Sequence, residues 1–117
     1  MVKRCNETFT FKLGETIIEK DCHFVVGRYQ EPNNLALMVE DSNDCQVCVC
    51  SVNPRYKHSE NTLCVKDWSE NKGMVEFLVS QGIILNEYDW FESEESGFVV
   101  INAYKLTEKG LKLFEGI

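Results

Sequence analysis

The feature that most limits what this chain can fold into is a strict alternation of apolar and polar residues close to its amino terminus. Over residues 7–13 the apolar positions are Phe9, Phe11 and Leu13, and the residues between them are polar. This period of two puts the apolar side chains on one face of an extended strand. Because a half-buried strand needs neighbouring strands for its backbone hydrogen bonds, the alternation predicts a β-sheet.

Further strand-like runs continue through the first half of the chain. They cover residues 16–19, 24–29, 35–40, 46–52 and 62–66. Clusters of turn-forming residues, rich in Asn, Asp and Pro, separate them at residues 31–34, 41–44 and 53–55. Short strands joined by tight turns predict an antiparallel meander.

One amphipathic helix is predicted over residues 70–81. Ser69 is suited to cap its first turn, Glu70 complements the helix dipole, and Gly82 supplies a stop. Its apolar face is formed at helical spacing by Met74, Phe77 and Leu78.

Two more strands follow this helix, over residues 83–91 and 98–106, with a polar loop at residues 92–97 between them. Thr107 is predicted to cap a short C-terminal helix. The predicted fold class is therefore α+β: an antiparallel β-sheet of five to seven strands, one main amphipathic helix packed on it, and a short C-terminal helix. The length of 117 residues and an apolar fraction of 44% suit a single domain over residues 1–117.

The charge and the first residues of the chain limit its compartment and its partners. The formal net charge of −7 disfavours direct binding to nucleic acid, since such binding relies on Lys and Arg to neutralise phosphates, and it favours a basic partner. The amino terminus lacks the apolar run of a secretory signal, and no apolar run approaches the roughly 20 residues of a membrane span. We expect a cytoplasmic protein with reduced cysteines and no membrane segment.

The most chemical-looking motif is Cys45-x-x-Cys48-x-Cys50. Thiolates at this spacing can bind zinc, with further ligands drawn from Cys22, His23, His58 or Cys64. One C-x-x-C pair within a strand-like alternation more often belongs to a core, so we expect core cysteines and no metal, with zinc and redox chemistry as the alternatives.

Catalysis is not predicted. A cysteine nucleophile needs an adjacent histidine, and the neighbours Cys22 and His23 would point to opposite faces of a strand. The sequence has no paired carboxylates on one element and no glycine-rich phosphate loop. We expect neither an enzyme nor a cofactor.

A one-signed segment in the second half is the favoured partner-binding surface. No Lys or Arg occurs between Lys72 and Lys105, and aromatic residues are interleaved there with acids. Aromatic residues rimmed by charge are typical of interface hot spots, although a core hairpin with a solvated acidic tip would give the same pattern. The predicted partner-binding residues are Glu87, Tyr88, Asp89, Trp90, Glu92, Glu94 and Glu95.

A second hypothesis is a small-molecule binder that sequesters a signalling nucleotide. Basic side chains would hold its phosphates at a pocket or at the interface of a homodimer. The candidate ligand-binding residues are Arg28, Arg55, Lys57 and Lys66.

The segment from Leu63 to Leu78, with Lys66-Asp67-Trp68-Ser69-Glu70-Asn71-Lys72-Gly73-Met74 at its centre and Gly82-Ile83-Ile84 after it, resembles a family of small uncharacterised proteins carried by phages, plasmids and gut Firmicutes. The resemblance covers about the middle third of the chain. It implies a mobile-element accessory protein, and such acidic proteins often act against host defence. The expected function is stoichiometric, anti-CRISPR-like inhibition of a host protein with a basic nucleic-acid-binding surface.

The C-terminal end carries a different resemblance. Residues 104–111, Tyr-Lys-Leu-Thr-Glu-Lys-Gly-Leu, are similar to the segment after the wing hairpin of winged-helix regulators. Such domains need about three helices before the wing, whereas this sequence predicts one, and its hairpin is acidic. A winged-helix-like DNA-binding regulator therefore stays as a further alternative.

Overall fold

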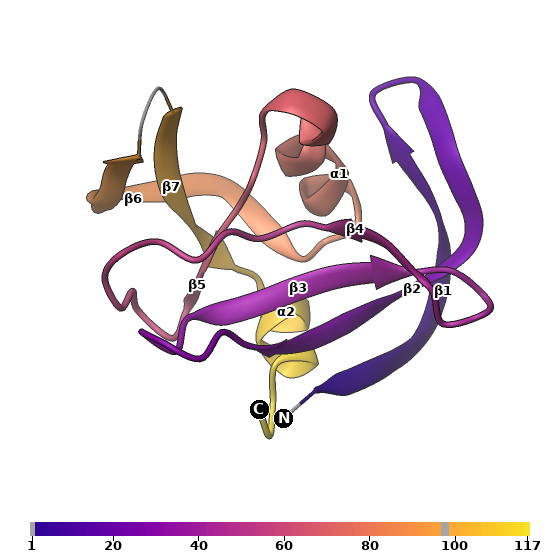
Figure 1. The fold of residues 1–117 in the computed structure, drawn as a ribbon, viewed down its shortest axis with the longest axis horizontal. Coiled ribbons are helices and arrows are strands. Elements are labelled where there is room, and N and C mark those ends of the chain that lie inside the picture. The colour runs from indigo at the N-terminus through magenta and orange to yellow at the C-terminus, as the bar shows by residue number, and fades with distance from the viewer. Residues whose placement is uncertain (1, 97–98) are drawn as a thin grey trace.

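The computed structural model describes residues 2–96 and 99–117, apart from the side chains of residues 89–96 and 99. One antiparallel sheet contains, in spatial order, β1 (Lys3–Leu13), β2 (Thr16–Arg28), β3 (Leu35–Glu40) and β4 (Gln46–Val49). A second contains β5 (Thr62–Cys64), β7 (Val99–Leu106) and β6 (Ile84–Ser96), with β7 in the middle. The helical elements are the 3-10 turn η1 (Ser69–Asn71), α1 (Met74–Ser80) and α2 (Glu108–Leu113). The predicted α+β class, with one main helix and a short C-terminal helix, is confirmed (Figure 1).

The prediction of a single sheet of five to seven strands is wrong, because the strands divide into sheets of four and three. An isolated bridge between Ser51 and Val65 connects them. Next to it, the N–H of Lys66 donates to the Cys50 carbonyl at 2.9 Å. Pro54 follows soon after and has no N–H to extend the pairing, so β4 cannot continue into a full ladder with β5. The alternation of residues does not reveal where a ladder stops.

The β1–β2 hairpin has the alternation predicted from the sequence, with Phe11 buried and Phe9 and Leu13 partly buried. The two runs predicted at residues 16–19 and 24–29 are one strand, β2. Phe9 pairs with Cys22 but Phe11 pairs with Glu19, so β2 carries one extra residue at this point. Asp21 accommodates it with a positive φ of 56°, which makes a bulge where the sequence suggested a break.

Helix α1 is shorter than the predicted range of 70–81, and its cap differs. Ser69 lies in η1 with a φ of 54° and does not cap the helix. The Asp67 carboxylate accepts hydrogen bonds from the N–H groups of Gly73 (2.7 Å) and Met74 (2.9 Å) instead. Gly73 has a φ of 99°, and a Cβ there would lie 3.3 Å from the backbone nitrogen of Gly14. Glycine is therefore needed at residue 73 for the start of α1 to approach the β1–β2 turn this closely.

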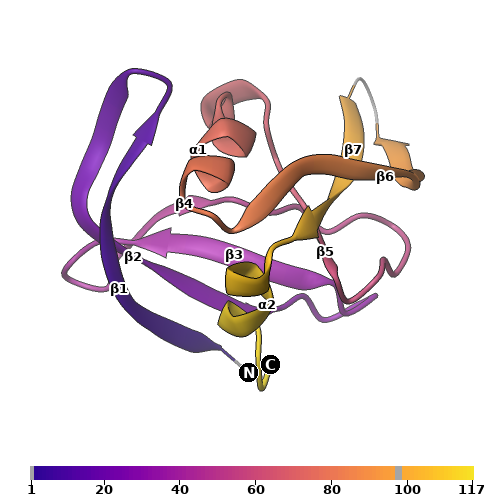
Figure 2. The same cartoon turned by 180° about the vertical axis from the view of Figure 1, so that it is seen from behind.

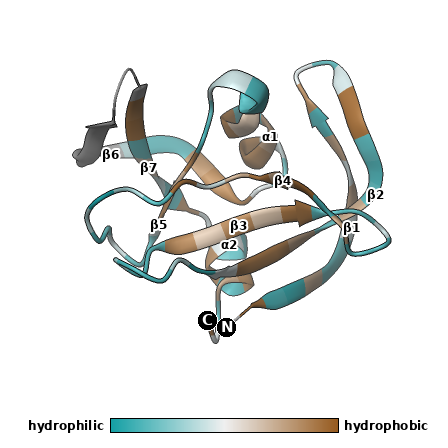
Figure 3. Cartoon of the chain, in the orientation of Figure 1, coloured by the Kyte–Doolittle hydropathy of each residue, from teal (hydrophilic) through white to brown (hydrophobic). Residues whose placement is uncertain are grey.

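The apolar face predicted for α1 is buried in a core that both sheets share. Met74 and Leu78 are fully buried, and the Phe77 ring lies 5.0 Å from that of Phe11 and 5.6 Å from that of Phe9. Figures 1 and 2 show α1 between the β1–β2 and β6–β7 hairpins, and Figure 3 shows apolar segments in α1, β2 and β3. The core also includes Leu37, Val39, Leu63, Ile84, Leu106 and Phe114.

Helix α2 follows β7 and brings the end of the chain back to its beginning. Thr107 caps it as predicted, since its side chain accepts from the N–H of Gly110 at 3.0 Å. Gly110 lies so close to the residue before β6 that an added Cβ would be 2.2 Å from the Ile83 carbonyl oxygen. Lys3 donates to the Glu115 carbonyl at 3.0 Å, and the two termini lie side by side in Figures 1 and 2.

Candidate functional site

The favoured partner-binding segment lies on strand β6, at the edge of the three-stranded sheet. Residues 92–96, predicted as a loop, belong to this strand, whose backbone pairs with β7 through Glu94 and Ile101. Of the predicted residues, Glu87 and Tyr88 are described and exposed. The side chains of the others, Asp89, Trp90, Glu92, Glu94 and Glu95, lie outside the described part of the chain.

Tyr88 is held by a neighbouring strand while remaining accessible. It pairs with Tyr104 of β7, and the two rings make an edge-to-face contact with centroids 5.4 Å apart. Tyr88 is 49% exposed, whereas Tyr104 is partly buried, and desolvation raises the pKa of the Tyr104 phenol. Leu85, on the same strand, is 42% exposed. An apolar residue and an oriented aromatic ring are therefore presented at the surface beside Glu87.

Two of the candidate ligand-binding cations, Arg28 and Lys57, are paired with one acidic side chain. Arg28 forms a two-point ion pair with Glu60, and Lys57 donates to the same carboxylate at 2.8 Å. Arg28 and Lys57 also donate to the Asn33 carbonyl. Hydrogen bonds from Arg28 and then from Lys57 lower the pKa of Glu60 to about 2. This cluster joins the end of β2 to the segment before β5, a structural role that sequence reasoning missed because Glu60 lies in a loop.

The other two predicted cations lie on different segments from Arg28 and Lys57. Lys66 pairs with Glu70, four residues later, at the edge of a groove. Arg55 is exposed between β4 and β5. The four cations thus do not share one carboxylate partner, and two of them are neutralised by Glu60.

The cysteines of the predicted motif are free thiols in three different environments. Cys45 is exposed, Cys48 is partly buried and Cys50 is fully buried. Among the described residues, which include all six cysteines, no cysteine belongs to a group of three potential metal ligands. The geometry therefore gives no support to the zinc alternative, with or without Cys22, His23, His58 or Cys64.

A polar cluster that the sequence did not suggest surrounds His23, whose side chain is 1% exposed. Its Nε2 lies 3.1 Å from the Glu40 carboxylate and 3.4 Å from that of Asp44. Arg4 lies 3.1 Å from both Asp44 and the His23 ring nitrogen. The Arg4 Nε–H donates to this ring nitrogen, and the buried Nδ1 has no hydrogen-bond partner. The cluster joins β1, β2 and β3. Arg4 supplies the positive charge that offsets its carboxylates.

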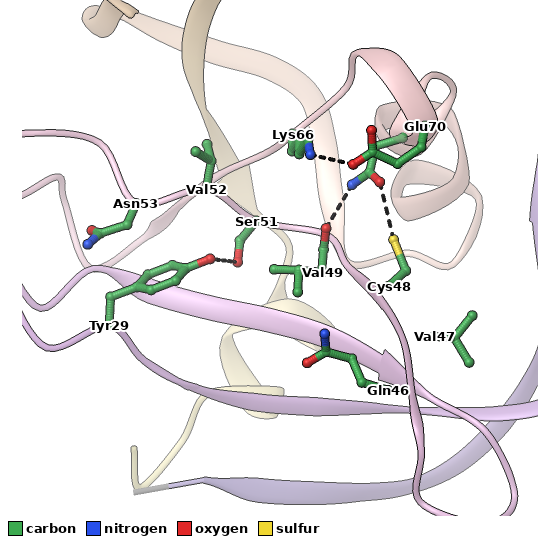
Figure 4. A pocket seen from close by; sticks show the side chains of 11 residues that line it. Tyr29, Gln46, Val47, Cys48, Val49, Ser51, Val52, Asn53, Lys66 and Glu70 are labelled. Carbon is green, nitrogen blue, oxygen red and sulfur yellow. Dashed lines mark hydrogen bonds and ion pairs between the residues drawn. The ribbon is translucent and has the colours of Figure 1, made fainter.

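A groove of about 440 Å³ lies between β4, Tyr29 and the segment around Lys66 (Figure 4). Inside it, the Tyr29 hydroxyl lies 2.9 Å from that of Ser51, which accepts from the Leu37 N–H at 2.9 Å. Its lining is a mixture of apolar and polar side chains, including Val47, Cys48, Val49, Asn53 and Asn71. A concave surface of this size and mixed character can accept a small molecule.

A thiol and a buried amide are hydrogen-bonded at this groove. The Cys48 thiol donates to Asn71 Oδ1 at 3.4 Å. The buried Asn71 then donates from Nδ2 to the Val49 carbonyl at 2.7 Å. The neighbouring Cys50 lowers the pKa of the Cys48 thiol, while burial raises the pKa of Cys50 well above its usual value.

Comparison with known proteins found no matching family model, no matching curated protein and no matching solved structure. Of the helices described, α1 and α2 are only seven and six residues long, and none is long and apolar enough to cross a bilayer. Within the segment that carries the phage-family resemblance, Asp67 caps α1, Asn71 supports β4 and Gly73 approaches β1. These contacts give that segment a structural role, and the family itself stays a prediction.

Proposed function

We propose that this protein acts by binding another protein through strand β6 and is not an enzyme. The single observation that carries the proposal is an edge strand with four consecutive exposed residues, from Leu85 to Tyr88. The expected partner is a host protein with a basic nucleic-acid-binding surface. In this view the protein is a cytoplasmic accessory of a phage or mobile element that inhibits a defence protein stoichiometrically.

The exposed face of β6 has the features of a binding surface. An edge strand offers backbone groups that no neighbour within the sheet uses. Tyr88 is oriented by Tyr104, so little side-chain entropy would be lost when a partner covers its ring. Amphipathic aromatic residues at the centre of an interface commonly carry most of its binding energy.

The charge of the segment favours a basic partner. Six acids and no Lys or Arg lie between Lys72 and Lys105. A one-signed segment, where it is presented to a partner, accelerates the encounter with an oppositely charged protein and competes with phosphates for the same cations. Inhibition would follow from occupation of the partner's nucleic-acid-binding surface.

The two alternatives have less support. A nucleotide binder would need free cations, but Arg28 and Lys57 are both paired with Glu60. A winged-helix regulator would need several helices before the β6–β7 hairpin, and among the described residues α1 and the short η1 are the helical elements there.

An affinity capture from a Firmicutes lysate tests the proposal when charge-matched variants are compared. The test variant replaces five acids of β6 by their amides: Glu87→Gln, Asp89→Asn, Glu92→Gln, Glu94→Gln and Glu95→Gln. The control removes the same charge from five exposed acids elsewhere: Glu15→Gln, Glu19→Gln, Glu31→Gln, Glu108→Gln and Glu115→Gln. A basic protein captured by the wild type and the control, but lost with the test variant, is the expected result.

The captured protein is then purified and titrated with the wild type, and its nucleic-acid binding is measured. We expect binding to be abolished near one equivalent of inhibitor, and Tyr88→Ala to weaken the effect by about tenfold or more. Equal capture by both charge variants, or a partner that binds nucleic acid unchanged in the complex, would reject the proposal.

A further inference from the structure

Three potential metal-ligand atoms converge where β3 ends and the turn towards β4 begins. The Nε2 of His23 lies 3.1 Å from Glu40 Oε1 and 3.4 Å from Asp44 Oδ1. His23 of β2 and Glu40 of β3 are a registered cross-strand pair, and Asp44 lies in the turn that follows β3. An imidazole nitrogen and two carboxylate oxygens are ligands that bind divalent transition metals.

Hydrogen bonds cannot satisfy all the contacts of the His23 ring nitrogen. An imidazole Nε2 carries either one proton or one lone pair. If it accepts from the Arg4 Nε–H, its lone pair also faces the Glu40 carboxylate at 3.1 Å. If it carries the proton, its N–H faces the Arg4 N–H. One contact is unfavourable in either tautomer, and a metal ion bound by Nε2 and both carboxylates would remove the conflict.

We propose that His23, Glu40 and Asp44 form a binding site for a divalent transition metal, with zinc as the ion that suits these ligands best. Ligands bonded to one zinc ion at about 2.0–2.1 Å in a tetrahedron lie about 3.3–3.4 Å apart. The two separations from Nε2, 3.1 and 3.4 Å, are close to this value. The site is separate from the β6 surface, and it is not the zinc site considered for the cysteine motif, because no cysteine takes part.

The ligands are held in place before a metal binds. The His23 side chain is 1% exposed and therefore fixed in the core. The Asp41 carboxylate accepts from the N–H groups of Asn43 (2.9 Å) and Cys45 (3.0 Å), and the Asp44 N–H donates to the Asp41 carbonyl at 3.0 Å. Little ordering is needed on binding. The Asp44 side chain is 62% exposed, which gives a metal ion access from solvent and leaves room for a water ligand.

Arg4 is the group that a metal must displace. Its Nε lies 3.1 Å from Asp44 Oδ1 and 3.1 Å from His23 Nε2, so the guanidinium supplies one positive charge where the metal would supply two. The Arg4 side chain is 55% exposed and can move into solvent. A neutral His23 bound through Nε2 has its proton on Nδ1, as it does when it accepts from Arg4, so the ring keeps its tautomer. Arg4 is therefore a competitor of the metal.

The test is a calorimetric titration of the folded, metal-free chain with zinc ions. All proteins carry Cys45→Ser, because the exposed thiol of Cys45 would itself attract zinc. We expect this parent to bind one equivalent, and Asp44→Asn or Glu40→Gln to weaken binding by at least about tenfold. Glu15→Gln, which removes the same charge from an exposed acid of the β1–β2 turn, should bind as the parent does.

Arg4→Ala distinguishes metal binding from a purely structural role of the cluster. Loss of a like charge beside the site should tighten zinc binding by about tenfold or more. Circular dichroism of each metal-free variant checks that it is folded. Cobalt in place of zinc should show no thiolate charge-transfer absorption, since its ligands are nitrogen and oxygen. Zinc binding that Asp44→Asn leaves unchanged, thiolate absorption with cobalt, or no zinc binding by either the parent or Arg4→Ala would overturn the proposal.

Discussion

The Asp67 carboxylate accepts a hydrogen bond from the backbone N–H of Gly73 at 2.7 Å, across six positions of sequence. A second bond to Met74 completes the cap of α1. We therefore expect Asp67→Ala to lower the free energy of unfolding by about 1 kcal/mol, the usual cost of losing a cap. Urea denaturation followed by circular dichroism measures it. Ser69→Ala is the control and should change stability by less than about 0.5 kcal/mol, since Ser69 makes no capping bond. The reverse order of the two effects would contradict this assignment.

Gly110→Ala should destabilise the protein although alanine is the better helix former. In an unconstrained helix the change stabilises by about 1 kcal/mol. Here the new Cβ would lie 2.2 Å from the Ile83 carbonyl oxygen, and a backbone atom cannot move aside without shifting β6. Thermal unfolding checks the sign of the effect. Lys112→Ala, at an exposed position of the same helix, should leave the melting temperature almost unchanged; a more stable Gly110→Ala variant would show that α2 packs differently.

Asn71→Ala should cost about 1–3 kcal/mol, the penalty of leaving a buried polar group unpaired. The amide that supports the Val49 carbonyl would be missing, and the Cys48 thiol would lose its acceptor. The free energy of unfolding in urea is the measurement. Asn43→Ala, in an exposed turn, is the matched control. Equal small losses for both variants would mean that water replaces the Asn71 amide.

The Glu60 ion pairs should make stability depend on pH at the acid end. The folded pKa of Glu60, about 2, lies below its ordinary value of 4.5, so its contribution is present above pH 4.5 and is lost as the pH falls towards 2. The side chain is 57% exposed, and solvent screening limits the effect to about 1 kcal/mol or less.

The comparison of wild type with Glu60→Gln isolates this term. Their difference in unfolding free energy should be largest near pH 6, shrink below pH 4 and diminish in high salt. Glu31→Gln, an exposed acid of the neighbouring turn, controls for the loss of charge. A difference that grows as the pH falls would be inconsistent with a carboxylate held by Arg28 and Lys57.

Local sequence patterns predicted the strands and helices well where apolar and polar residues alternate along a strand, or where the capping residue directly precedes its helix. The run at 35–40 has the bounds of β3, and Thr107 caps α2 as expected. Pairing partners were not predictable, because the division into two sheets depends on where the Ser51–Val65 bridge ends, and no periodicity encodes this. The Asp67 cap acts across a 3-10 turn, whereas the sequence pattern favours the nearer Ser69. Sequence patterns do not reveal the roles of Glu60 and Asn71, because their partners, Arg28 and Val49, lie more than twenty residues away.

The position of Cys50 has a mechanical consequence. Its carbonyl accepts the Lys66 N–H, and the next residue, Ser51, makes the bridge to Val65. The thiols are thus attached to the seam along which the two sheets meet. A displacement of the chain at Cys50 would therefore be transmitted to the three-stranded sheet through these bonds, without passing through the helices.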